Sequence, residues 1–500
     1  MEARDGIILD LRERGAREER EVAEMEREAE EFYGRAEEME EEREGEREKE
    51  REKEKEKERE KEKEAAEAPP PLPVPSLPSV QVDPASVPAF DTSSCAIGWQ
   101  SYVSPALTSY FFPTSSSSPA LPSTPPPPSS CVEHGELLAV RCYIKDLTVT
   151  PSLITAAYGG EPLATVMGQA EDVEYAKYEV GAFSAEERDL LPKAHMSHAW
   201  YINKVLAAMT ATDGGASTGG ASTDGASTNV GSSSCSPTPT LFITRYEYVN
   251  LFHTMTDWWN VFEAVPQEFW TENNKLDIVW LDGHAQGNLD PVWSTAFGQV
   301  TPVKHLKGPT CYSRAIVVSA GYASPLWFNN RSWRSPPCPA RADAFRHHML
   351  ARFGLSGAKR VPKRVVLIDR VPYTAHPRSA PGKMPRTISN IEDLSGAVEA
   401  AGGEVKVVRF EELSFGEQLR EVAEADILVG IHGAGLSHVL FMSEGSTMVE
   451  LATNTLGMFS GFASWRPDVA FVSVAMGSGQ RNYELRDKHI GEVVKILEKK

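Results

Sequence analysis

Short apolar runs alternate with segments whose apolar residues recur at helical spacing along residues 131–500. The apolar runs predict strands at 137–144, 241–245, 276–281, 315–318, 365–368, 405–408, 427–431, 446–452 and 471–474. The helical spacing predicts helices at 251–262, 290–297, 343–353, 393–401, 415–425 and 490–497. Because strands that alternate with helices usually build parallel sheets, the pattern predicts an α/β protein.

Changes in composition divide the chain into four parts. Residues 1–68 are a charged leader, helical or disordered, and residues 69–130 are a Pro/Ser-rich linker. The linker holds an aromatic cluster, Tyr110-Phe111-Phe112, that is a candidate for contact with the folded part. Residues 131–359 and 360–500 then predict two α/β halves with a cleft between them. A Gly/Ser/Thr-rich insertion at 211–238 interrupts the first half and predicts a flexible surface segment.

The formal net charge of -20 is uneven, because residues 1–68 hold 29 acidic and 17 basic residues. The remaining charge is mildly negative, which argues against a nucleic-acid partner. The six cysteines contain no Cys-x-x-Cys pair, so they favour a few disulfides over a zinc site. We identify neither a signal peptide nor an apolar run long enough to span a membrane.

The stretch Ile427–Phe441 combines a buried strand, a Gly/His turn and an apolar helical pattern. Gly433 and Gly435 allow a ligand to approach the backbone closely, and a helix start offers N–H groups to an anion. An ordinary glycine turn of an α/β protein is the alternative interpretation. No Gly-x-Ser-x-Gly motif is present, which argues against a hydrolase.

Two pairs of residues are candidates for acid–base chemistry. His253 and Asp257 are four residues apart, so a helix would place them on one face, where the carboxylate would orient the imidazole and raise its basicity. Asp282 and His284 follow a predicted strand, where open α/β sheets bind ligands. A core histidine and a strand-end turn are the respective alternatives.

Three further residues in the second half are candidates for holding a nucleotide. Arg370 and Arg386 lie near predicted strand ends, and their guanidinium groups suit a diphosphate. Glu450, near the end of the strand at 446–452, could accept two ribose hydroxyls or cap a neighbouring segment. Surface arginines are common, so each arginine alone is weak evidence.

The segment Thr244–Trp258 closely resembles plant-type N-glycan β-1,2-xylosyltransferases of glycosyltransferase family 61 (also described as DUF563-like). The matching strand end Val279–His284 and further similar segments support this resemblance: Gly159–Leu163, Val166–Gly168 and Gly181–Phe183. Arg386–Asn390 and Gly430–Leu436 resemble donor-side motifs of the wider family. The resemblance covers roughly residues 131–500.

This resemblance implies a GT-B-like fold, with two Rossmann-like domains that face a cleft. The implied activity transfers xylose from UDP-xylose, with inversion, to the core β-mannose of N-glycans on a glycoprotein. Location in the Golgi behind a membrane anchor is also implied, although the N-terminal sequence shows charged residues and prolines in place of the anchor.

The resemblance and the residues together suggest a mechanism without an obligatory metal or other cofactor, because no Asp-x-Asp motif lies at a suitable strand end. His253 would be the base, oriented by Asp257, with Asp282 as the rival base. The donor-binding residues would be Arg370, Arg386, Asn390, His432, Gly433, Ala434, Gly435 and Glu450. The alternatives are a family 61 enzyme that uses UDP-N-acetylglucosamine or a UDP-arabinose, a non-catalytic nucleotide-sugar binder, and a structural adaptor based on the leader.

Overall fold

The computed structural model describes 110–112, 129–134, 139–167, 173–185, 200–211, 235–245, 247–266, 269–270, 276–321, 324–326, 338–371, 386–453, 458–477 and 482–500. The predictions for the leader, for most of the linker and for most of the insertion therefore lie outside the described residues. All described elements belong to one compact unit, Val80–Lys500. Among the described helices, none has the length and apolar character needed to cross a membrane.

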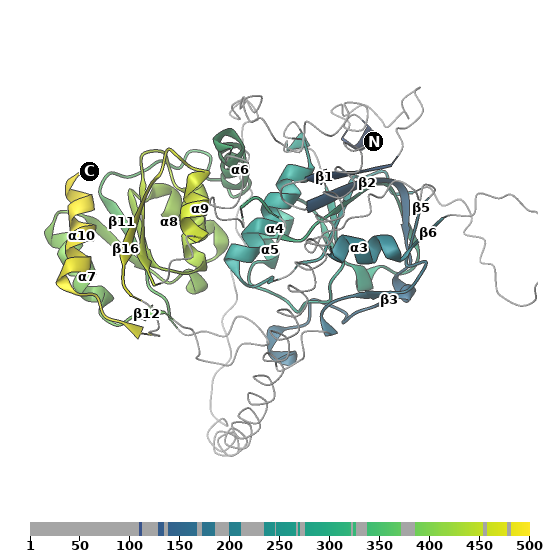
Figure 1. Cartoon of the computed structure of the whole chain (residues 1–500), viewed down its shortest axis with the longest axis horizontal. Coiled ribbons are helices and arrows are strands. Elements are labelled where there is room, and N and C mark those ends of the chain that lie inside the picture. The colour runs from purple at the N-terminus through teal and green to yellow at the C-terminus, as the bar shows by residue number, and fades with distance from the viewer. Residues whose placement is uncertain are drawn as a thin grey trace, which may run out of the picture. The chain divides into compact units, whose positions relative to one another are not determined.

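The first sheet has eight strands, with the order β6–β5–β2–β10–β7–β8–β9 and β1 paired to β2 (Figure 1). Their bounds are β1 Ser130–His134, β2 Ala139–Val149, β5 Phe183–Ala185, β6 Met209–Ala211, β7 Thr240–Ile243, β8 Asp277–Trp280, β9 Val300–Pro302 and β10 Thr310–Val318. Strands β10, β7, β8 and β9 are parallel, as predicted. Strand β2 is antiparallel to β1, to which a short connection joins it as a hairpin, and it is also antiparallel to β5 and β10. A uniformly parallel first half is therefore wrong.

Four α-helices accompany the first sheet: α3 Trp200–Ala207, α4 Leu251–Ala264, α5 Asp290–Ala296 and α6 Pro339–Arg352. The short elements are η3 Pro151–Leu153, η4 Leu163–Thr165, η8 Val303–His305 and the ribbon of β3 Ile154–Thr155 with β4 Lys177–Tyr178. Helix α4 begins where the side chain of Asn250 accepts a hydrogen bond from the Phe252 N–H. Nearly all of α4 is buried, including Trp258 and Trp259, so this helix is part of the core.

The second sheet is fully parallel, with the order β13–β11–β14–β15–β16. Its strands are β11 Arg364–Ile368, β13 Glu404–Val408, β14 Ile427–Ile431, β15 Thr447–Ala452 and β16 Ala470–Ala475. Its helices are α7 Ile391–Ala400, α8 Phe415–Glu424, α9 Met458–Ser464 and α10 Asp487–Glu498, with η10 Phe410–Glu412 and the ribbon of β12 Thr387–Ile388 and β17 Asn482–Tyr483. Counted along the chain, the strand order is 2-1-3-4-5, which is a doubly wound arrangement.

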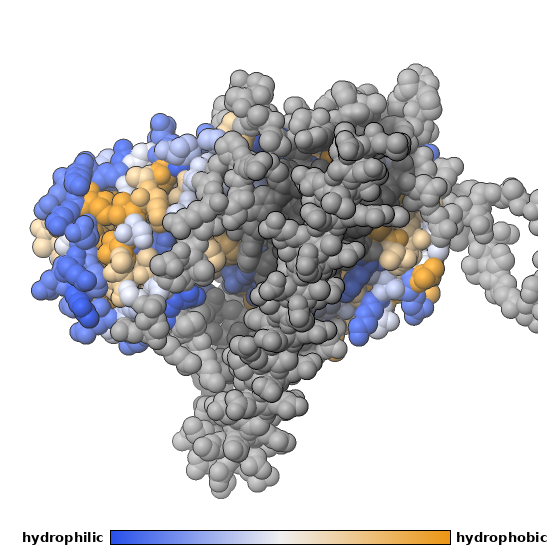
Figure 2. Space-filling model, viewed as in Figure 1, coloured by the Kyte–Doolittle hydropathy of each residue, from blue (hydrophilic) through white to orange (hydrophobic). Residues whose placement is uncertain are grey.

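Helices cover both faces of this second sheet, with α7 and α10 on one side and α8 and α9 on the other (Figure 1). Alternate residues of β11 divide accordingly. Val365 and Leu367 pack in the core with α7 and α10, whereas Val366 and Ile368 pack in the core with α8. Figure 2 shows hydrophilic residues over α7 and α10 and hydrophobic residues beside them, over β16 at the edge of the sheet. The core on the α8 side also contains residues of α4, so both sheets share one hydrophobic cluster.

The segment after β14 is a 3-10 helix, η11 Ala434–Phe441, rather than the α-helix that the apolar spacing suggests. His438 Nδ1 lies 2.8 Å from the carbonyl oxygen of Gly435, to which it donates a hydrogen bond. In an α-helix that carbonyl would accept the N–H of Val439. The side-chain bond competes with the α-helical pattern at this position.

The aromatic cluster of the linker is part of the core. Tyr110, Phe111 and Phe112 are buried. The ring of Phe111 lies 5.4 Å from Tyr143 of β2, and Phe112 lies 5.3 Å from Phe269. These edge-to-face contacts are favourable and attach this point of the linker to the first sheet.

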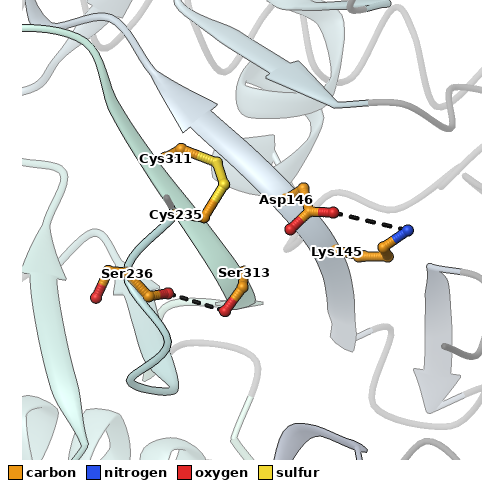
Figure 3. The surroundings of a disulfide bond; sticks show 6 residues. All are labelled: Lys145, Asp146, Cys235, Ser236, Cys311 and Ser313. Carbon is orange, nitrogen blue, oxygen red and sulfur yellow. Dashed lines mark hydrogen bonds and ion pairs between the residues drawn. A yellow bond between two sulfur atoms is a disulfide. The ribbon is translucent and has the colours of Figure 1, made fainter. Parts of the chain in front are cut away.

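Two described disulfides stabilise the first sheet. Cys131 and Cys142 face each other across the β1–β2 hairpin. Cys235 is bonded to Cys311 of β10, next to the hydrogen bond between Ser313 and the Ser236 carbonyl (Figure 3). Cys338 is disulfide-bonded as well. Disulfides persist in oxidising compartments, so they agree with passage through the secretory pathway.

The two described disulfides close loops of different length, with separations of 76 residues for Cys235–Cys311 and 11 for Cys131–Cys142. Chain entropy gives about 4 kcal/mol of stabilisation for the long loop and about 3 kcal/mol for the short one. We expect the double substitution C235S/C311S to lower the free energy of unfolding more than C131S/C142S does. Urea denaturation without reductant would measure both, and a larger loss in C131S/C142S would contradict the expectation.

Candidate functional site

The carboxyl ends of β11 and β14 lie side by side, where the strand order of the second sheet reverses. Open α/β sheets bind ligands at this point. Arg370 follows β11, and its Nη1 donates a hydrogen bond to the backbone oxygen of His432, at 3.0 Å. A Cβ at Gly433 would overlap Arg370 Nη1, so a larger residue there would displace the guanidinium from this position. The structure therefore brings together three of the predicted donor-binding residues.

His432 forms a buried pair with Glu450. Its Nδ1 lies 2.5 Å from Glu450 Oε1, and both side chains are almost fully buried. The pairing of β14 with β15 places Gly430 opposite Glu450, which brings the carboxylate to the strand end. Because an ionised carboxylate only accepts hydrogen bonds, the pair holds the imidazole proton on Nδ1 and fixes the ring. Glu450 thus contacts His432, a role that the sequence did not reveal.

Ala434 and Gly435 are the half-exposed tip of the turn that starts η11. The N–H groups at a helix start are not used inside the helix, and they favour negative charge. The tip follows His432 and Gly433 directly, so its backbone and the guanidinium of Arg370 border the same strand end. This arrangement suits a phosphate group.

Arg386 and Asn390 flank β12, and the structure gives them different surroundings. Arg386 is half-buried, with a left-handed backbone (φ 66°), and burial lowers its pKa while Tyr483 opposes the shift. Asn390 uses its amide for structure: its Nδ2 donates to the Leu485 carbonyl and its Oδ1 accepts the Leu485 N–H. The geometry therefore disfavours Asn390 as a donor-binding residue.

A surface depression of about 520 Å³ lies between α7 and the end of β13. Its charged lining consists of Asp369, Glu392, Glu399 and Glu412 with one arginine, Arg409. Arg409 Nε is itself bonded to Asp369, at 2.8 Å. An acidic lining repels a diphosphate, so this depression is a poor donor site and the Arg370–His432 edge remains the better one.

His253 lies in the first turn of α4 and is half-buried. Burial lowers the pKa of its imidazole to about 4. The shift is opposite to the one expected from a neighbouring carboxylate, so the prediction that Asp257 raises its basicity is wrong. One Asp257 oxygen instead accepts the Gly321 N–H at 2.5 Å, which attaches α4 to the segment after β10. At neutral pH His253 is unprotonated and able to accept a proton.

Asp282 is held in a buried ion-pair network. Its two oxygens accept three hydrogen bonds from Arg245, from the backbone N–H, Nε and Nη2, at 2.7–3.3 Å. Burial alone would raise the pKa of Asp282, but Arg245 outweighs burial and holds it below its usual value. Arg245 also pairs with Asp290 and stacks on Trp280. A carboxylate so fully engaged is a structural group, and the geometry disfavours Asp282 as the base.

His284 belongs to a neighbouring buried cluster that the sequence did not predict. Its Nδ1 lies 2.9 Å from Glu174 Oε2, its Nε2 lies 2.9 Å from the Arg245 carbonyl, and its ring stacks on Tyr248. Glu174 is 110 residues away in the chain, so local spacing offers no signal for this contact. Both imidazole nitrogens of His284 are engaged, which makes it a positioning residue.

The glycine segment Gly159–Gly160 lies against the strand end at Gly283. The Gly160 N–H donates to the His284 carbonyl at 2.9 Å, and the Gly283 N–H donates to the Glu174 carbonyl at 2.7 Å. A Cβ at Gly283 would lie 2.5 Å from the Ala157 oxygen, so only glycine permits this approach. The motifs around 159–161, 245 and 282–284 thus assemble at the carboxyl ends of β7 and β8.

Aromatic contacts connect the start of α4 with the edge of the second sheet. Phe252, next to His253, lies 5.9 Å from Phe459 of α9, and Phe459 lies 5.0 Å from His432 (ring centroids). The candidate base and the Arg370–His432 edge therefore flank one aromatic cluster. This contact brings the predicted acceptor and donor sides together.

One described group of potential metal ligands exists, formed by Asp146, Cys235 and Cys311. The two sulfur atoms are joined in a disulfide beside Asp146 (Figure 3), so they offer no thiolate to a metal. This group of described residues is therefore not a metal site. That the reaction needs no metal stays a prediction.

Residues 251–449 match the profile of Glycosyltransferase 61. This stretch is a glycosyltransferase 61 domain. It begins with α4 and ends in β15, so it contains His253, Asp282, Arg370, His432 and the glycine turn. The residues that the geometry brings together at both strand edges lie largely inside the glycosyltransferase 61 domain, whereas Arg245 and the 159–174 segment precede it.

Two plant proteins and an animal protein show related sequences. The chain is 33% identical over 333 residues to the β-1,2-xylosyltransferase RCN11 of Oryza sativa subsp. japonica, covering 61% of each chain. It is 25% identical over 379 residues to a β-1,2-xylosyltransferase of Arabidopsis thaliana, covering 64% of this chain and 70% of that protein. The EGF domain-specific O-linked N-acetylglucosamine transferase of Gallus gallus is 28% identical over 227 residues, covering 43% and 40%. The match thus spans about three fifths of the rice protein.

The contact of Gly283 with Ala157 gives a test of the first-sheet edge. We expect G283A to push the 157–161 segment away from β8 and to destabilise the fold by about 1–3 kcal/mol, as overpacking does. G308A is the matched control, because nothing lies within 4 Å of a Cβ at Gly308. Thermal unfolding would compare the two. Equal melting temperatures of G283A and G308A would contradict the close packing.

Proposed function

We propose that this chain is an inverting glycosyltransferase that transfers xylose from UDP-xylose to the core β-mannose of N-glycans. The observation that carries the proposal is the similarity to β-1,2-xylosyltransferases, which extends beyond the glycosyltransferase 61 domain. The strand-edge geometry supplies groups suited to this chemistry. The donor, the acceptor and the linkage are parts of the proposal.

On the donor side, Arg370 and the turn His432–Gly435 would bind the diphosphate of the UDP-sugar. The guanidinium and the N–H groups at the start of η11 favour the charge that develops on the leaving UDP. Glu450 would hold the His432 ring in place rather than accept the ribose hydroxyls. Arg386 remains a donor-binding candidate from its position beside β12.

On the acceptor side, the oxygen of a mannose hydroxyl would attack the anomeric carbon as the bond to the UDP oxygen breaks. The hydroxyl proton passes to a base, for which His253 is our choice. Its lowered pKa keeps the imidazole neutral at the pH of secretory compartments. The Arg245–Asp282–Asp290 network would position this edge without taking the proton.

We place the enzyme in the secretory pathway, with the Golgi as the proposed compartment. The disulfides Cys131–Cys142 and Cys235–Cys311 support an oxidising environment. A membrane anchor, an N-glycan on a glycoprotein acceptor and turnover without metal belong to the same proposal.

A transferase with another donor is the second candidate function, and the similarity to an N-acetylglucosamine transferase favours it. That similarity spans 43% of the chain, against 61% for the rice protein. A shared donor fold with a different sugar pocket would explain both similarities. A nucleotide-sugar binder without turnover is the remaining alternative, and an activity assay separates it.

The full-length chain, produced in an oxidising host, would be incubated with a core N-glycan ending in N-acetylglucosamine and a panel of UDP-sugars. We expect a mass gain of one pentose with UDP-xylose, with and without a chelator. Gain of a hexosamine from UDP-N-acetylglucosamine would replace the proposed donor. UDP binding without any transfer would overturn the enzymatic proposal.

The assignment of the base gives a separate prediction. We expect H253A to lower kcat by about 10²–10⁴-fold while UDP binding persists, because only proton removal is lost. Since the neutral imidazole is the active form, wild-type activity should fall as pH drops through about 4 and stay level above pH 5. H347A is the control, because His347 lies on α6 and its Nδ1 is bonded to the Asp343 carbonyl of the same helix. Activity of H253A equal to that of H347A would remove His253 from the mechanism.

A further inference from the structure

Tyr158 presents an aromatic face to solvent next to the edge of the first sheet. The residue is 60% exposed, and among the exposed large hydrophobic residues of the described ranges it alone is aromatic. The ring stacks on the imidazole of His305, with centroids 4.2 Å apart and planes 26° apart. A stacked ring has a preferred orientation, so one face of Tyr158 is covered and the other is open to a ligand.

Hydrogen bonds on both sides of this pair hold the two rings in place. His305 belongs to η8, directly after β9, and its Nε2 lies 3.1 Å from the Gly159 carbonyl oxygen. The next residue, Gly160, is bonded to the His284 carbonyl at the end of β8. Tyr158 therefore stands on the same strand edge as the buried Arg245–Asp282 network.

An exposed apolar residue is bonded to the segment that carries this ring. Val173 is 44% exposed, and its carbonyl accepts the N–H of Ala157, the neighbour of Tyr158. Met167 is 39% exposed in the same segment. An exposed apolar residue next to the segment of an exposed ring adds to the apolar surface that a ligand could cover.

We propose that Tyr158, held by His305, is the platform on which a sugar ring of the acceptor glycan stacks. A pyranose has an apolar face of C–H groups that packs on a flat aromatic ring, while its hydroxyl groups point outward to polar partners. This inference rests on the proposed function, and it assigns the acceptor sugars to the first-sheet edge, apart from the nucleotide at Arg370.

Polar groups beside the platform favour a sugar over an apolar peptide. In the same turn, Glu161 Oε1 accepts the Gly159 N–H at 3.1 Å. Its Oε2 has no hydrogen-bond partner among the described residues. A buried acceptor without a partner is costly, and because this oxygen is shielded from solvent a bridging water would satisfy it. An aromatic face in the same turn as a carboxylate side chain matches the apolar and polar surfaces that a pyranose presents.

The test compares Y158A with Y158F, which keeps the ring, and with V180A as the matched control, because Val180 is 74% exposed and lies in the turn after β4. For full-length protein we expect Y158A to raise KM for the free core glycan about three- to tenfold, with KM for UDP-xylose unchanged. Y158F and V180A should stay near wild type. Ligand-observed NMR with the same glycan, without donor, gives a binding readout independent of turnover.

The outcomes separate this inference from the proposed function. Transfer with equal glycan KM in Y158A and V180A would overturn the platform and leave the function standing. Glycan binding that depends on Tyr158 in a chain without transfer would support the platform and count against the function. Loss of binding to a deglycosylated acceptor peptide in Y158A, with glycan binding intact, would show a peptide surface and overturn the inference.

Discussion

The buried guanidinium of Arg245 is the interaction on which the first-sheet edge depends. It is 1% exposed, it is bonded to Asp282 and Asp290, and it lies 3.4 Å from the centre of the Trp280 ring. A buried charge that loses its partner costs about 3–5 kcal/mol. Removing any one of these charged side chains would therefore leave a buried partner without full compensation. The network joins the ends of β7 and β8 to α5, and the backbone of Arg245 also holds His284. The orientation of His284 at this edge therefore depends on the network as well.

Local periodicity made much of the fold predictable. The strands of the second sheet and its helices α7, α8 and α10 follow from apolar runs and helical spacing, since each lies between its own turns. Pairing between distant segments has no such local signal. The antiparallel pairing of β2 with β10 was missed for that reason, because the paired residues lie far apart in the chain. The 3-10 helix η11 was missed for a local reason, since apolar spacing does not reveal the side-chain bond from His438 to the Gly435 carbonyl. The cleft of a GT-B arrangement stays a prediction.

The sequence predicted which residues belong to the candidate site better than it predicted which of them contact one another. His432, Gly433 and Arg370 were identified from strand ends and glycines, which are features of short segments. The spacing of His253 and Asp257 suggested an imidazole–carboxylate pair, yet such a pair forms between His432 and Glu450. Parallel register brings those two together across 18 residues, whereas Asp257 is bonded to Gly321, 64 residues away. Chain spacing therefore suggested an imidazole–carboxylate pair on α4, whereas the structure forms one at the ends of β14 and β15.

The disulfide between Cys235 and Cys311 has a consequence for how the chain can diverge. It fixes the chain to β10 five residues before β7 begins at Thr240, and the backbone bonds of Ser236 to the Cys311 carbonyl and the Ser313 N–H reinforce the attachment. The bond therefore separates β7 and the Arg245 network from changes in the chain before Cys235. Related genes can therefore gain or lose codons between β6 and Cys235 without altering the catalytic scaffold, which makes this position a natural place for length variation and for inserting a reporter.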